Sequence, residues 1–309
     1  MQLHSLSGIS ITCLLRYLLR ATMEIGEKRR SSSGYGKSPW IFKGSALYQI
    51  HLVKAETARA FIPKDFRLVE AFGYTLGGFF LASYEDSPAG VFDELVVIAG
   101  IVWNPPTSCA WAARVLVNSH EACDHGRKDV GLPSHVARFS KRITAVPKQQ
   151  SGKSSGFSDI LRIGTKFSDP YNVTDVKVTE VDGSALADIC NIRVQSTAST
   201  SKLGNWMGPS IKMSLPSFSG NTNYNPNLLK YSCHIECRVR PVKPAIVSMP
   251  MEDEAEKLKG HHNQTQDSSE SELDLSVSVM LSKPIIALQF KCLEMQVEAP
   301  IVLSPSKTS

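Results

Sequence analysis

The stretch from His125 to His135, HGRKDVGLPSH, gathers side chains that can take part in chemistry. Arg127 can steady an oxyanion, and Ser134 and His135 directly follow a Gly-x-Pro turn. A histidine titrates near neutral pH, so His135 is a candidate acid or base. The alternative is an exposed loop histidine without a chemical role. The stretch therefore indicates a polar site at a turn, with Arg127, Ser134 and His135 as candidate residues.

A second candidate is Glu94, which lies in the almost wholly apolar segment from Phe92 to Trp103. Burial in such a segment would raise the pKa of its carboxyl group, as a general acid requires. The alternative is an ion pair with Arg127, which would lower that pKa and make Glu94 structural. The sequence leaves both open, because the net shift depends on the distance between the two groups.

Three tryptophans are candidate ligand-binding residues. Trp103, Trp111 and Trp206 can line an apolar pocket, although large aromatic side chains are also common in plain cores.

The cysteines argue against a metal site. Cys233 and Cys237 lie in a segment that alternates apolar and polar residues, which is typical of a half-buried strand. Residues four apart on a strand lie about 13 Å apart, too far to share one zinc ion. The seven cysteines include no C-x-x-C pair. We therefore expect no metal and no cofactor.

Composition limits the class of protein. The 309 residues carry a net charge of +5, and 42% of them are hydrophobic, as in ordinary globular proteins. The densest basic cluster, Arg238 to Lys243, contains no aromatic residue for stacking on bases, so no nucleic-acid partner is expected. The apolar run from Ile9 to Leu19 is too short to span a membrane, so no transmembrane segment is expected.

Periodicity predicts a mainly β chain with a few short helices. An N-cap at Asn118 or Ser119 and the breakers Gly131 and Pro133 delimit one helix near the candidate site. Strands are predicted at 46–53, 72–84, 92–103, 110–117, 231–240 and 285–297, and helices at 55–61 and 120–128.

Polar segments set the expected domain organisation. Residues 1–39 are predicted to be a disordered extension, and 40–304 a single domain with disordered insertions at about 148–158 and 252–274. The strand pattern at 285–297 favours one domain, because a lone strand after an insertion must rejoin the same sheet. Residues 1–22 resemble a transit peptide in composition, or they precede a true start at Met23.

Several segments together resemble the acetoacetate decarboxylase superfamily. They occur in that family's order and are 57–63 (TARAFIP), 92–94 (FDE), 126–133 (GRKDVGLP) and 212–220 (KMSLPSFSG). The resemblance implies a mainly β (α+β) fold, an antiparallel barrel or sheet around an enclosed cavity with a few short helices. It also implies that Glu94, Arg127 and His135 converge on that cavity.

The chain departs from this family where the chemistry matters most. The decarboxylase forms a Schiff base from the first of two adjacent lysines after the Gly-x-Pro, and Ser134 and His135 stand there instead. An arginine near the family's first strand is also absent from 43–45 (KGS). We therefore expect no decarboxylation, although the fold can persist.

Longer strings resemble a plant group associated with the accumulation of neoxanthin, an allenic xanthophyll made from the epoxide violaxanthin. They are 40–44 (WIFKG), 103–111 (WNPPTSCAW) and 204–209 (GNWMGP). This resemblance implies a role in xanthophyll synthesis, an apolar ligand, and contact with other proteins of the pathway. It implies a chloroplast location, or a cytoplasmic one if residues 1–22 are not a transit peptide. The oligomeric state stays open.

Two hypotheses for function follow. In the first, the protein is an accessory or ligand-binding protein whose cavity holds a xanthophyll or its precursor. In the second, it is a cofactor-free enzyme that isomerises the epoxide, with Glu94 and His135 as acid and base and Arg127 steadying an oxyanion. The absence of a complete catalytic motif favours the first.

Overall fold

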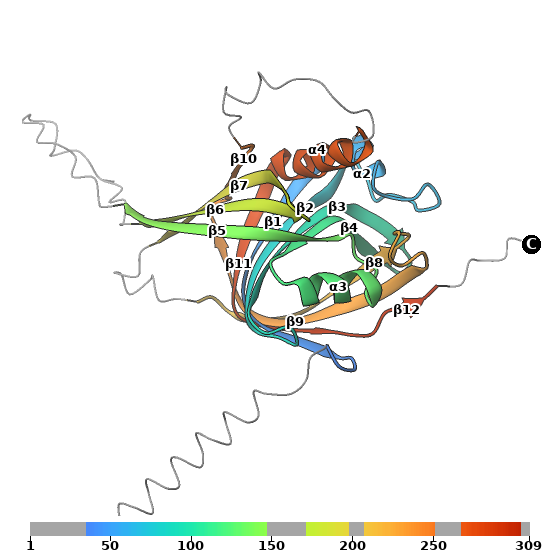
Figure 1. Cartoon of the computed structure of the whole chain (residues 1–309), viewed down its shortest axis with the longest axis horizontal. Helices are drawn as coiled ribbons and strands as arrows, with labels where there is room; N and C mark the ends of the chain where they lie inside the picture. Colours follow the sequence, from blue (N-terminus) through green and yellow to red (C-terminus); the bar gives the residue numbers. More distant parts are fainter. Residues whose placement is uncertain (1–34, 147–170, 198–206, 251–266, 304–309) are drawn as a thin grey trace, which may run out of the picture.

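The computed structural model describes residues 35–146, 171–197, 207–250 and 267–303 (Figure 1). Within these ranges the chain is mostly β-strand, with three helices. The strands are β1 (Trp40–Lys54), β2 (Tyr74–Asp86), β3 (Phe92–Asn104), β4 (Thr107–Val117), β5 (Ser134–Val146), β6 (Tyr171–Asp182), β7 (Ala185–Thr197), β8 (Ser210–Gly220), β9 (Leu228–Val242), β10 (Ile246–Ser248), β11 (Lys283–Val297) and β12 (Ile301–Val302). The helices are α2 (Ala55–Arg59), α3 (His120–Lys128) and α4 (Asp267–Leu281).

Seven strands close into a barrel in the order β4-β3-β2-β1-β11-β9-β8, and β8 returns to pair with β4. Most neighbours are antiparallel, while the short closing pair of β4 and β8 is parallel. Closure pairs the two edge strands, whose backbone groups could otherwise hydrogen-bond to another chain. The mainly β fold around an interior space, predicted from the sequence, is confirmed.

Strand β4 pairs with two different strands along its length. Its first half pairs with β8 at Ala110 and Trp111, and its last residues pair with β5 from Val115 to Val117. Strands β5, β6, β7 and β10 therefore leave the barrel as a separate sheet, which extends to the left in Figure 1. The helix α3 lies beside this fork and contacts both β4 and β5.

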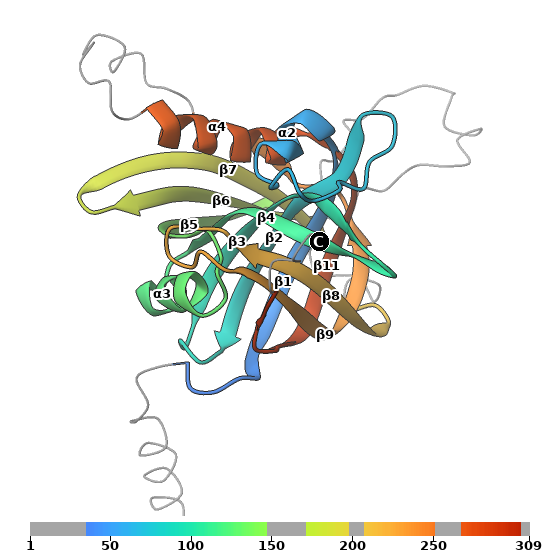
Figure 2. The ribbon, with the colours of Figure 1, turned by 90° about the vertical axis from the view of Figure 1, so that its right-hand side faces the viewer.

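Two apolar cores lie on opposite faces of the barrel wall. The inner core includes Phe42, Tyr84 and Phe290. The outer core includes Leu95 and Phe79, and α2 and α4 cover it as seen in Figure 2. Alternate residues of each strand serve one core or the other, because side chains point to opposite faces of a sheet.

The predicted elements are present with small shifts of their ends. Helix α3 covers the predicted 120–128, and Ser119 is its cap, because its hydroxyl accepts a hydrogen bond from the amide of Ala122. The strand predicted at 285–297 is β11, which lies between β1 and β9 in the barrel. This pairing supports one domain, which stays a prediction.

Two predicted boundaries are wrong. Helix α4 begins at Asp267, so the insertion predicted at 252–274 is helical over its last residues. Helix formation there is stabilised by packing, since Val277 and Met280 are buried in the outer core. The bound at residue 39 that was predicted for the N-terminal extension lies too far along the chain, because Tyr35 already packs on His125. The predicted insertion at 148–158 lies outside the described residues, as do 1–34 and 251–266.

Candidate functional site

The inner face of the barrel lines a cavity of about 380 Å³. Side chains from all seven barrel strands, from α3 and from residues 35–40 line it. Its wall is mainly aromatic and aliphatic. The aromatic members are Tyr35, Trp40, Phe42, Tyr48, Phe80, Tyr84, Phe92 and Tyr231. Such a cavity suits a small apolar ligand or one end of a longer one.

Glu94 lies on the inner face and lines this cavity. It pairs with Ala82 across β2 and β3, which places both on the inner face. The hydroxyl of Tyr84 donates a hydrogen bond of 2.7 Å to Glu94 Oε2. Burial raises the pKa of Glu94 to about 7, although the bond from Tyr84 opposes the rise. A pKa close to neutrality is the range in which a carboxyl group can act as a general acid.

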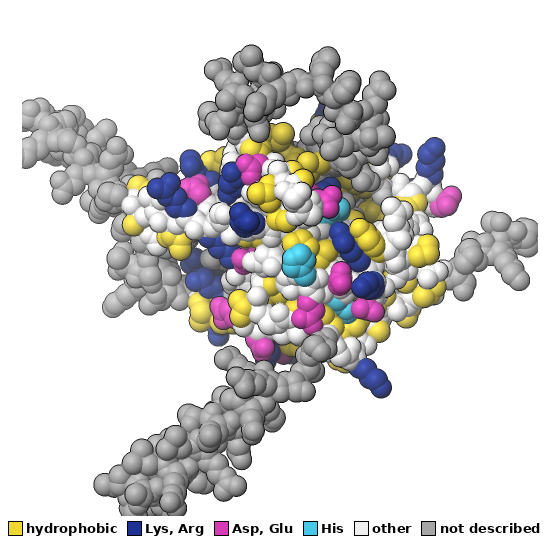
Figure 3. Space-filling model, in the orientation of Figure 1, with side chains coloured by type: hydrophobic (Ala, Val, Ile, Leu, Met, Phe, Trp, Pro, Cys, Tyr) yellow, Lys and Arg dark blue, Asp and Glu magenta, His cyan; other side chains and the backbone are white. Residues whose placement is uncertain are grey.

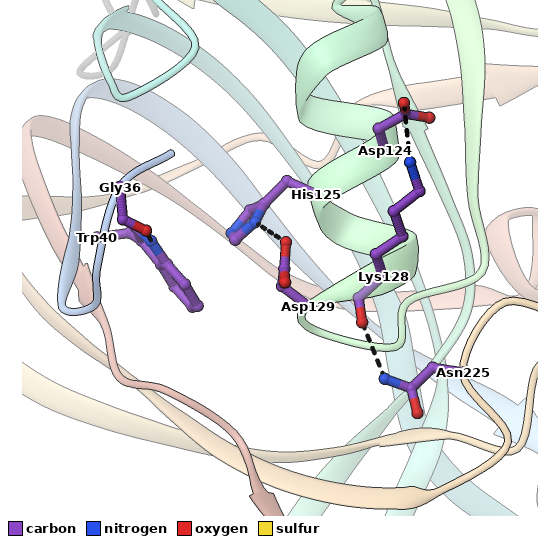
Figure 4. A network of polar contacts seen from close by, with 7 residues as sticks. All are labelled: Gly36, Trp40, Asp124, His125, Lys128, Asp129 and Asn225. Atoms are coloured by element: carbon purple, nitrogen blue, oxygen red, sulfur yellow. Dashed lines mark hydrogen bonds and ion pairs between the residues drawn. The ribbon is translucent and has the colours of Figure 1, made fainter. Parts of the chain in front are cut away.

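His125 also lines the cavity, from the inward side of α3, and its side chain is 8% exposed. Its Nδ1 lies 2.8 Å from Asp129 Oδ2, one helical turn later. Figure 4 shows the imidazole between Trp40 and Asp129. Tyr35 stacks on the ring with centroids 3.6 Å apart, and Trp40 contacts it edge-on. Burial lowers the pKa of His125 despite the hydrogen bond to Asp129, so the ring is neutral at pH 7.

His125 is not among the site residues predicted from the sequence, where His135 is the candidate histidine. The signal was present, because His125 and Asp129 are four residues apart in the candidate stretch. That spacing places two side chains on one helix face. What it does not show is which face of the helix turns toward the cavity.

His135 does not join Glu94. Glu94 pairs with Val117, and Val117 pairs with Val136, so these three residues share the inner face. His135 therefore points to the outer face, where its Nδ1 lies 2.7 Å from Glu180 Oε1. Glu180 also accepts a 2.5 Å hydrogen bond from Arg114. Although burial alone would raise the pKa of Glu180, the bonds from His135 and Arg114 lower it overall.

Arg127 and Ser134 hold the turn together and do not line the cavity. Arg127 Nε donates a 2.6 Å hydrogen bond to the carbonyl of Ser134, and its guanidinium lies 4.2 Å from the ring centre of Tyr224. Ser134 is 1% exposed and packs against Gly126. Glu94 therefore pairs with Tyr84 instead of Arg127. The predicted convergence of Glu94, Arg127 and His135 on one cavity is wrong.

The tryptophans lie in three different settings. Trp111 is buried in the outer core against Phe66 and Phe218, so it does not line the cavity. Trp103 pairs with the cavity residue Ser108 and therefore lies on the inner face. It is 48% exposed and is not one of the residues that line the cavity. Trp206 lies outside the described residues.

The thiol of Cys233, which also lines the cavity, is a poor nucleophile. Burial raises the pKa of the Cys233 thiol to about 12, and the nearby Glu94 adds to the rise, so the thiol stays protonated.

Among the described residues no cluster of His, Cys, Asp and Glu has the arrangement of a metal site. No helix in the same ranges is long and apolar enough to cross a membrane. Figure 3 shows both signs of charge interspersed over one face of the molecule.

Comparison with known proteins identifies the family. No family model matches the chain. The chain is 73% identical to Protein NEOXANTHIN-DEFICIENT 1 of Arabidopsis thaliana, and the match covers 91% of this chain and 99% of that protein. The chain belongs to the NEOXANTHIN-DEFICIENT 1 family. The Solanum lycopersicum member is 62% identical, over 91% of this chain and 98% of its own. The Oryza sativa member is 54% identical, over 90% and 94%.

Solved structures similar to this NEOXANTHIN-DEFICIENT 1 family member share little sequence with it. An acetoacetate decarboxylase from Legionella pneumophila matches with a TM-score of 0.46 and 12% identity, over 98% of both chains. The enduracididine biosynthesis enzyme MppR, complexed with pyruvate, matches with a TM-score of 0.49 and 12% identity, over 91% of this chain and 94% of its own.

Proposed function

We propose that this protein supports neoxanthin formation by binding the ring end of a xanthophyll, or of its precursor, in the barrel cavity. The family name, carried by relatives in three plants, links the family to neoxanthin. The observation that carries the proposal is the cavity itself, whose wall is mainly aromatic and aliphatic. A ring end group buries apolar surface there, and burial of apolar surface stabilises binding.

The size of the cavity fits one end of such a ligand. About 380 Å³ is at the lower end of the range for drug-sized ligands, so a long polyene with two rings does not fit whole. The inner face continues away from Glu94 to Leu76 and Trp103, each 48% exposed. We place the polyene along these side chains, which gives Trp103 the ligand contact predicted from the sequence.

Decarboxylation through a Schiff base is not the proposed activity. The resemblance places the imine-forming lysine at Ser134, whose side chain is buried against Gly126. No lysine of the described residues lines the cavity. Borohydride treatment with a ketone ligand should therefore give no adduct in residues 125–135, and a stable adduct there would contradict this view.

The test is a titration of the pure full-length protein with violaxanthin and with neoxanthin. Binding should quench tryptophan fluorescence, since Trp40 lines the cavity, and the pigment should be recovered unchanged. Ala112→Leu adds bulk inside the cavity, whereas Ala113→Leu adds the same bulk to a residue packed on the outer core. We expect the first variant to weaken binding and the second to bind as the wild type does. Equal binding by both variants would rule out the cavity as the site.

A second candidate function rests on Glu94, whose pKa of about 7 suits a general acid. Opening an epoxide to an allenic alcohol is an isomerisation that needs an acid at the epoxide oxygen and a base at a carbon-bound proton. Glu94→Gln keeps the shape of the side chain and removes the acid. If violaxanthin is converted to neoxanthin by the wild type and not by Glu94→Gln, the protein is an enzyme. Unchanged pigment with the wild type leaves the binding role.

A further inference from the structure

Apolar side chains are exposed at one end of the barrel, the end away from α3. They are Val69 (38%), Phe72 (101%), Tyr74 (43%), Leu76 (48%), Trp103 (48%) and Ile286 (40%), and we call these six residues the mouth patch. They lie where β1 and β3 end and where β2 and β11 begin, whereas α3 contacts Trp40 at the start of β1. In Figure 2 the loop that follows α2 and carries Val69 and Phe72 lies at the top right, away from α3. An exposed apolar patch of this kind marks a binding surface.

The strand register makes the mouth patch a continuation of the cavity wall. Leu76 lies on the same face of β2 as Phe80, and Trp103 lies on the same face of β3 as Ile101. Phe80 and Ile101 line the cavity. The strands β3, β2, β1 and β11 are neighbours in the barrel, so their inner faces form one surface that leads from the cavity to the mouth patch.

Phe72 projects from this surface at the tip of a tight hairpin. Two backbone hydrogen bonds between Ala71 and Tyr74 close the turn, and Phe72 and Gly73 have φ angles of 53° and 78°. Such a turn favours asparagine or glycine, and a bulky residue at positive φ is a rare exception. The side chain is also fully exposed to water. Phe72 is therefore unfavourable for the turn and for solvation, and the fold gives no reason for it.

Three cations lie on the same face as the mouth patch. Lys54 is the ladder partner of Tyr74. Arg67 lies opposite Trp103, because its carbonyl accepts a hydrogen bond from the Trp103 amide. Lys283 reaches this face through the ladder of β11 with β1. The apolar surface is thus interspersed with positive charge.

Carboxylates near these cations do not cancel their charge. Glu70 follows Leu68 by two residues and points with it to the outer face, where it pairs with Arg59 of α2 at 2.7 Å. Glu56 lies 3.5 Å from Lys54, but both side chains are well exposed, so this pair contributes little. No carboxylate of the described residues forms an ion pair with Arg67 or Lys283.

This combination matches the surface of an anionic membrane. Aromatic side chains favour the boundary between head groups and acyl chains, and lysine and arginine bind anionic head groups. A single projecting side chain such as Phe72 inserts between lipids without a preformed socket. The polyene that we place along Leu76 and Trp103 also leaves the cavity at this end, and its long apolar chain is soluble in lipid and not in water.

We propose that the mouth patch docks on an anionic lipid surface, with Phe72 inserted and with Lys54, Arg67 and Lys283 on the head groups. The docked barrel then exchanges its apolar ligand with the lipid without passing it through water. The docking surface goes beyond the proposed function, and only this route of the ligand rests on it.

The test is sedimentation of the full-length protein with pigment-free vesicles. Vesicles that contain phosphatidylglycerol should bind it at least tenfold more tightly than vesicles of phosphatidylcholine alone, because each cation near the surface adds to the attraction. Tryptophan emission should shift to the blue on binding, and the shift should be smaller in Trp103→Phe.

Phe72→Asn separates docking from folding. Asparagine suits the turn, so thermal stability should be kept or increased, while vesicle binding should fall about tenfold through the loss of one inserted phenylalanine. Val91→Asn is the matched control, since Val91 is 78% exposed in the turn between β2 and β3, at the opposite end of the barrel. It should bind vesicles as the wild type does. Equal binding by both variants would overturn the inference.

A pair of double variants tests the charges. Arg67→Gln with Lys283→Gln should remove most of the preference for phosphatidylglycerol. Lys177→Gln with Arg193→Gln changes the net charge equally on the outlying sheet of β6 and β7, and it should keep the preference. An equal loss in both would mean that overall charge, and not the mouth patch, attracts the vesicle, which would overturn the inference.

The remaining outcomes distinguish this inference from the proposed function. No vesicle binding by the wild type would overturn the docking surface and leave the violaxanthin titration as the test of the cavity. A wild type that ignores vesicles but forms a dimer that Phe72→Asn abolishes would make the patch an interface between copies, which also overturns it. Vesicle binding without any pigment binding would support docking and overturn the proposed function. Uptake of violaxanthin from loaded vesicles should be slower in Phe72→Asn than in Val91→Asn, and equal rates would overturn the route.

Discussion

Two polar clusters lie on opposite faces of the barrel wall formed by β3 and β4. The inner cluster consists of Glu94, which is hydrogen-bonded to Tyr84, and of His125 on α3. All three side chains line the cavity. The outer cluster joins Arg114, Glu180 and His135 between the barrel and the sheet of β5 to β7. Both are largely buried, yet their bonding differs. The outer groups bind one another, while the inner groups face the cavity and His125 Nε2 has no hydrogen-bond partner among the described residues.

The difference in charge follows from the difference in partners. Glu180 stays ionised because Arg114 and His135 outweigh the effect of burial on its pKa. Glu94 has only a neutral hydroxyl as a partner, so burial dominates and its pKa rises. A cluster whose charges compensate one another fixes the position of a sheet. The inner groups line the cavity in which we propose that the ligand lies.

Breaking the outer cluster should have the largest effect on stability. Glu180→Gln removes the charge opposite the buried Arg114, which leaves that charge uncompensated. We expect a loss of about 3 kcal/mol or more in the free energy of unfolding, measured by urea denaturation at pH 7. Glu236→Gln is the control, because its pair with Lys212 is well exposed, and it should cost less than about 1 kcal/mol.

If the two clusters are independent, a change in the outer cluster should leave ligand binding in the cavity unchanged. In the folded fraction of Glu180→Gln, the affinity for violaxanthin should equal that of the wild type. A large loss of affinity without a loss of stability would place the outer cluster in the ligand site instead.

The inner cluster should make stability depend on pH in a defined direction. The pKa of Glu94 is raised from its ordinary 4.5 to about 7, so the folded state holds a proton that the unfolded state releases between these values. Stability due to this proton is present below pH 4.5 and is lost as pH rises to 7. Relative to Glu94→Gln, the wild type should lose roughly 3 kcal/mol over this window.

The measurement is a set of denaturation curves from pH 4 to 8 for both proteins. The difference in free energy of unfolding between the two proteins should change from pH 4.5 to about pH 7 and stay constant above that. A difference that is constant across the whole range would show that Glu94 has an ordinary pKa, and would remove the contrast with Glu180.

Local patterns in the sequence were sufficient for much of the barrel. Alternation in 46–53 and 231–240, and the long apolar run at 92–103, correspond to β1, β9 and β3. Strands β5 to β8 were missed. β6 and β7 form an outlying sheet in which many polar residues are exposed, so their alternation is weak. Helix α4 was missed because its first residues are polar, and only packing on the outer core supports it.

The positions of the predicted site residues differ for a geometric reason. Glu94 lines the cavity, as the apolar composition of its strand indicates, and its role there stays a prediction. The face on which His135 lies depends on the parallel pairing of β4 with β5, which connects segments separated by a helix. A shift of one residue reverses the face of every side chain. Neither that register nor the orientation of His125 can be deduced from local sequence.

A smaller effect should follow from changing the partner of Glu94. Tyr84→Phe removes the hydroxyl that donates to Oε2, and this bond opposes the rise in pKa. The pKa of Glu94 should therefore rise above about 7, and stability at neutral pH should fall by about 1 kcal/mol. Infrared titration of the carboxyl band, with Glu94→Gln to identify it, measures the shift. A lower pKa in Tyr84→Phe would mean that water replaces the lost hydroxyl.

The smallest effect concerns the cap that orients His125. Ser119 accepts a hydrogen bond of 3.2 Å from the amide of Ala122 at the start of α3, and His125 lies on the last turn of this nine-residue helix. Ser119→Ala should lower the free energy of unfolding by about 1 kcal/mol, as is usual for the loss of an N-cap. Thermal denaturation measures this loss.

The same substitution also tests how α3 holds the inner cluster. The other end of α3 is fixed independently, because Asn225 donates a 2.9 Å hydrogen bond to the carbonyl of Lys128, and the Ser219 hydroxyl donates one to the carbonyl of Val130. With that end held, His125 should keep its position in Ser119→Ala, and the affinity for violaxanthin should equal that of the wild type. Ser119→Asp, which can also cap a helix, should restore the lost stability. If Ser119→Ala instead abolished violaxanthin binding and Ser119→Asp restored it, the start of α3 would control the cavity, and the inner cluster would be less rigid than its anchored end indicates.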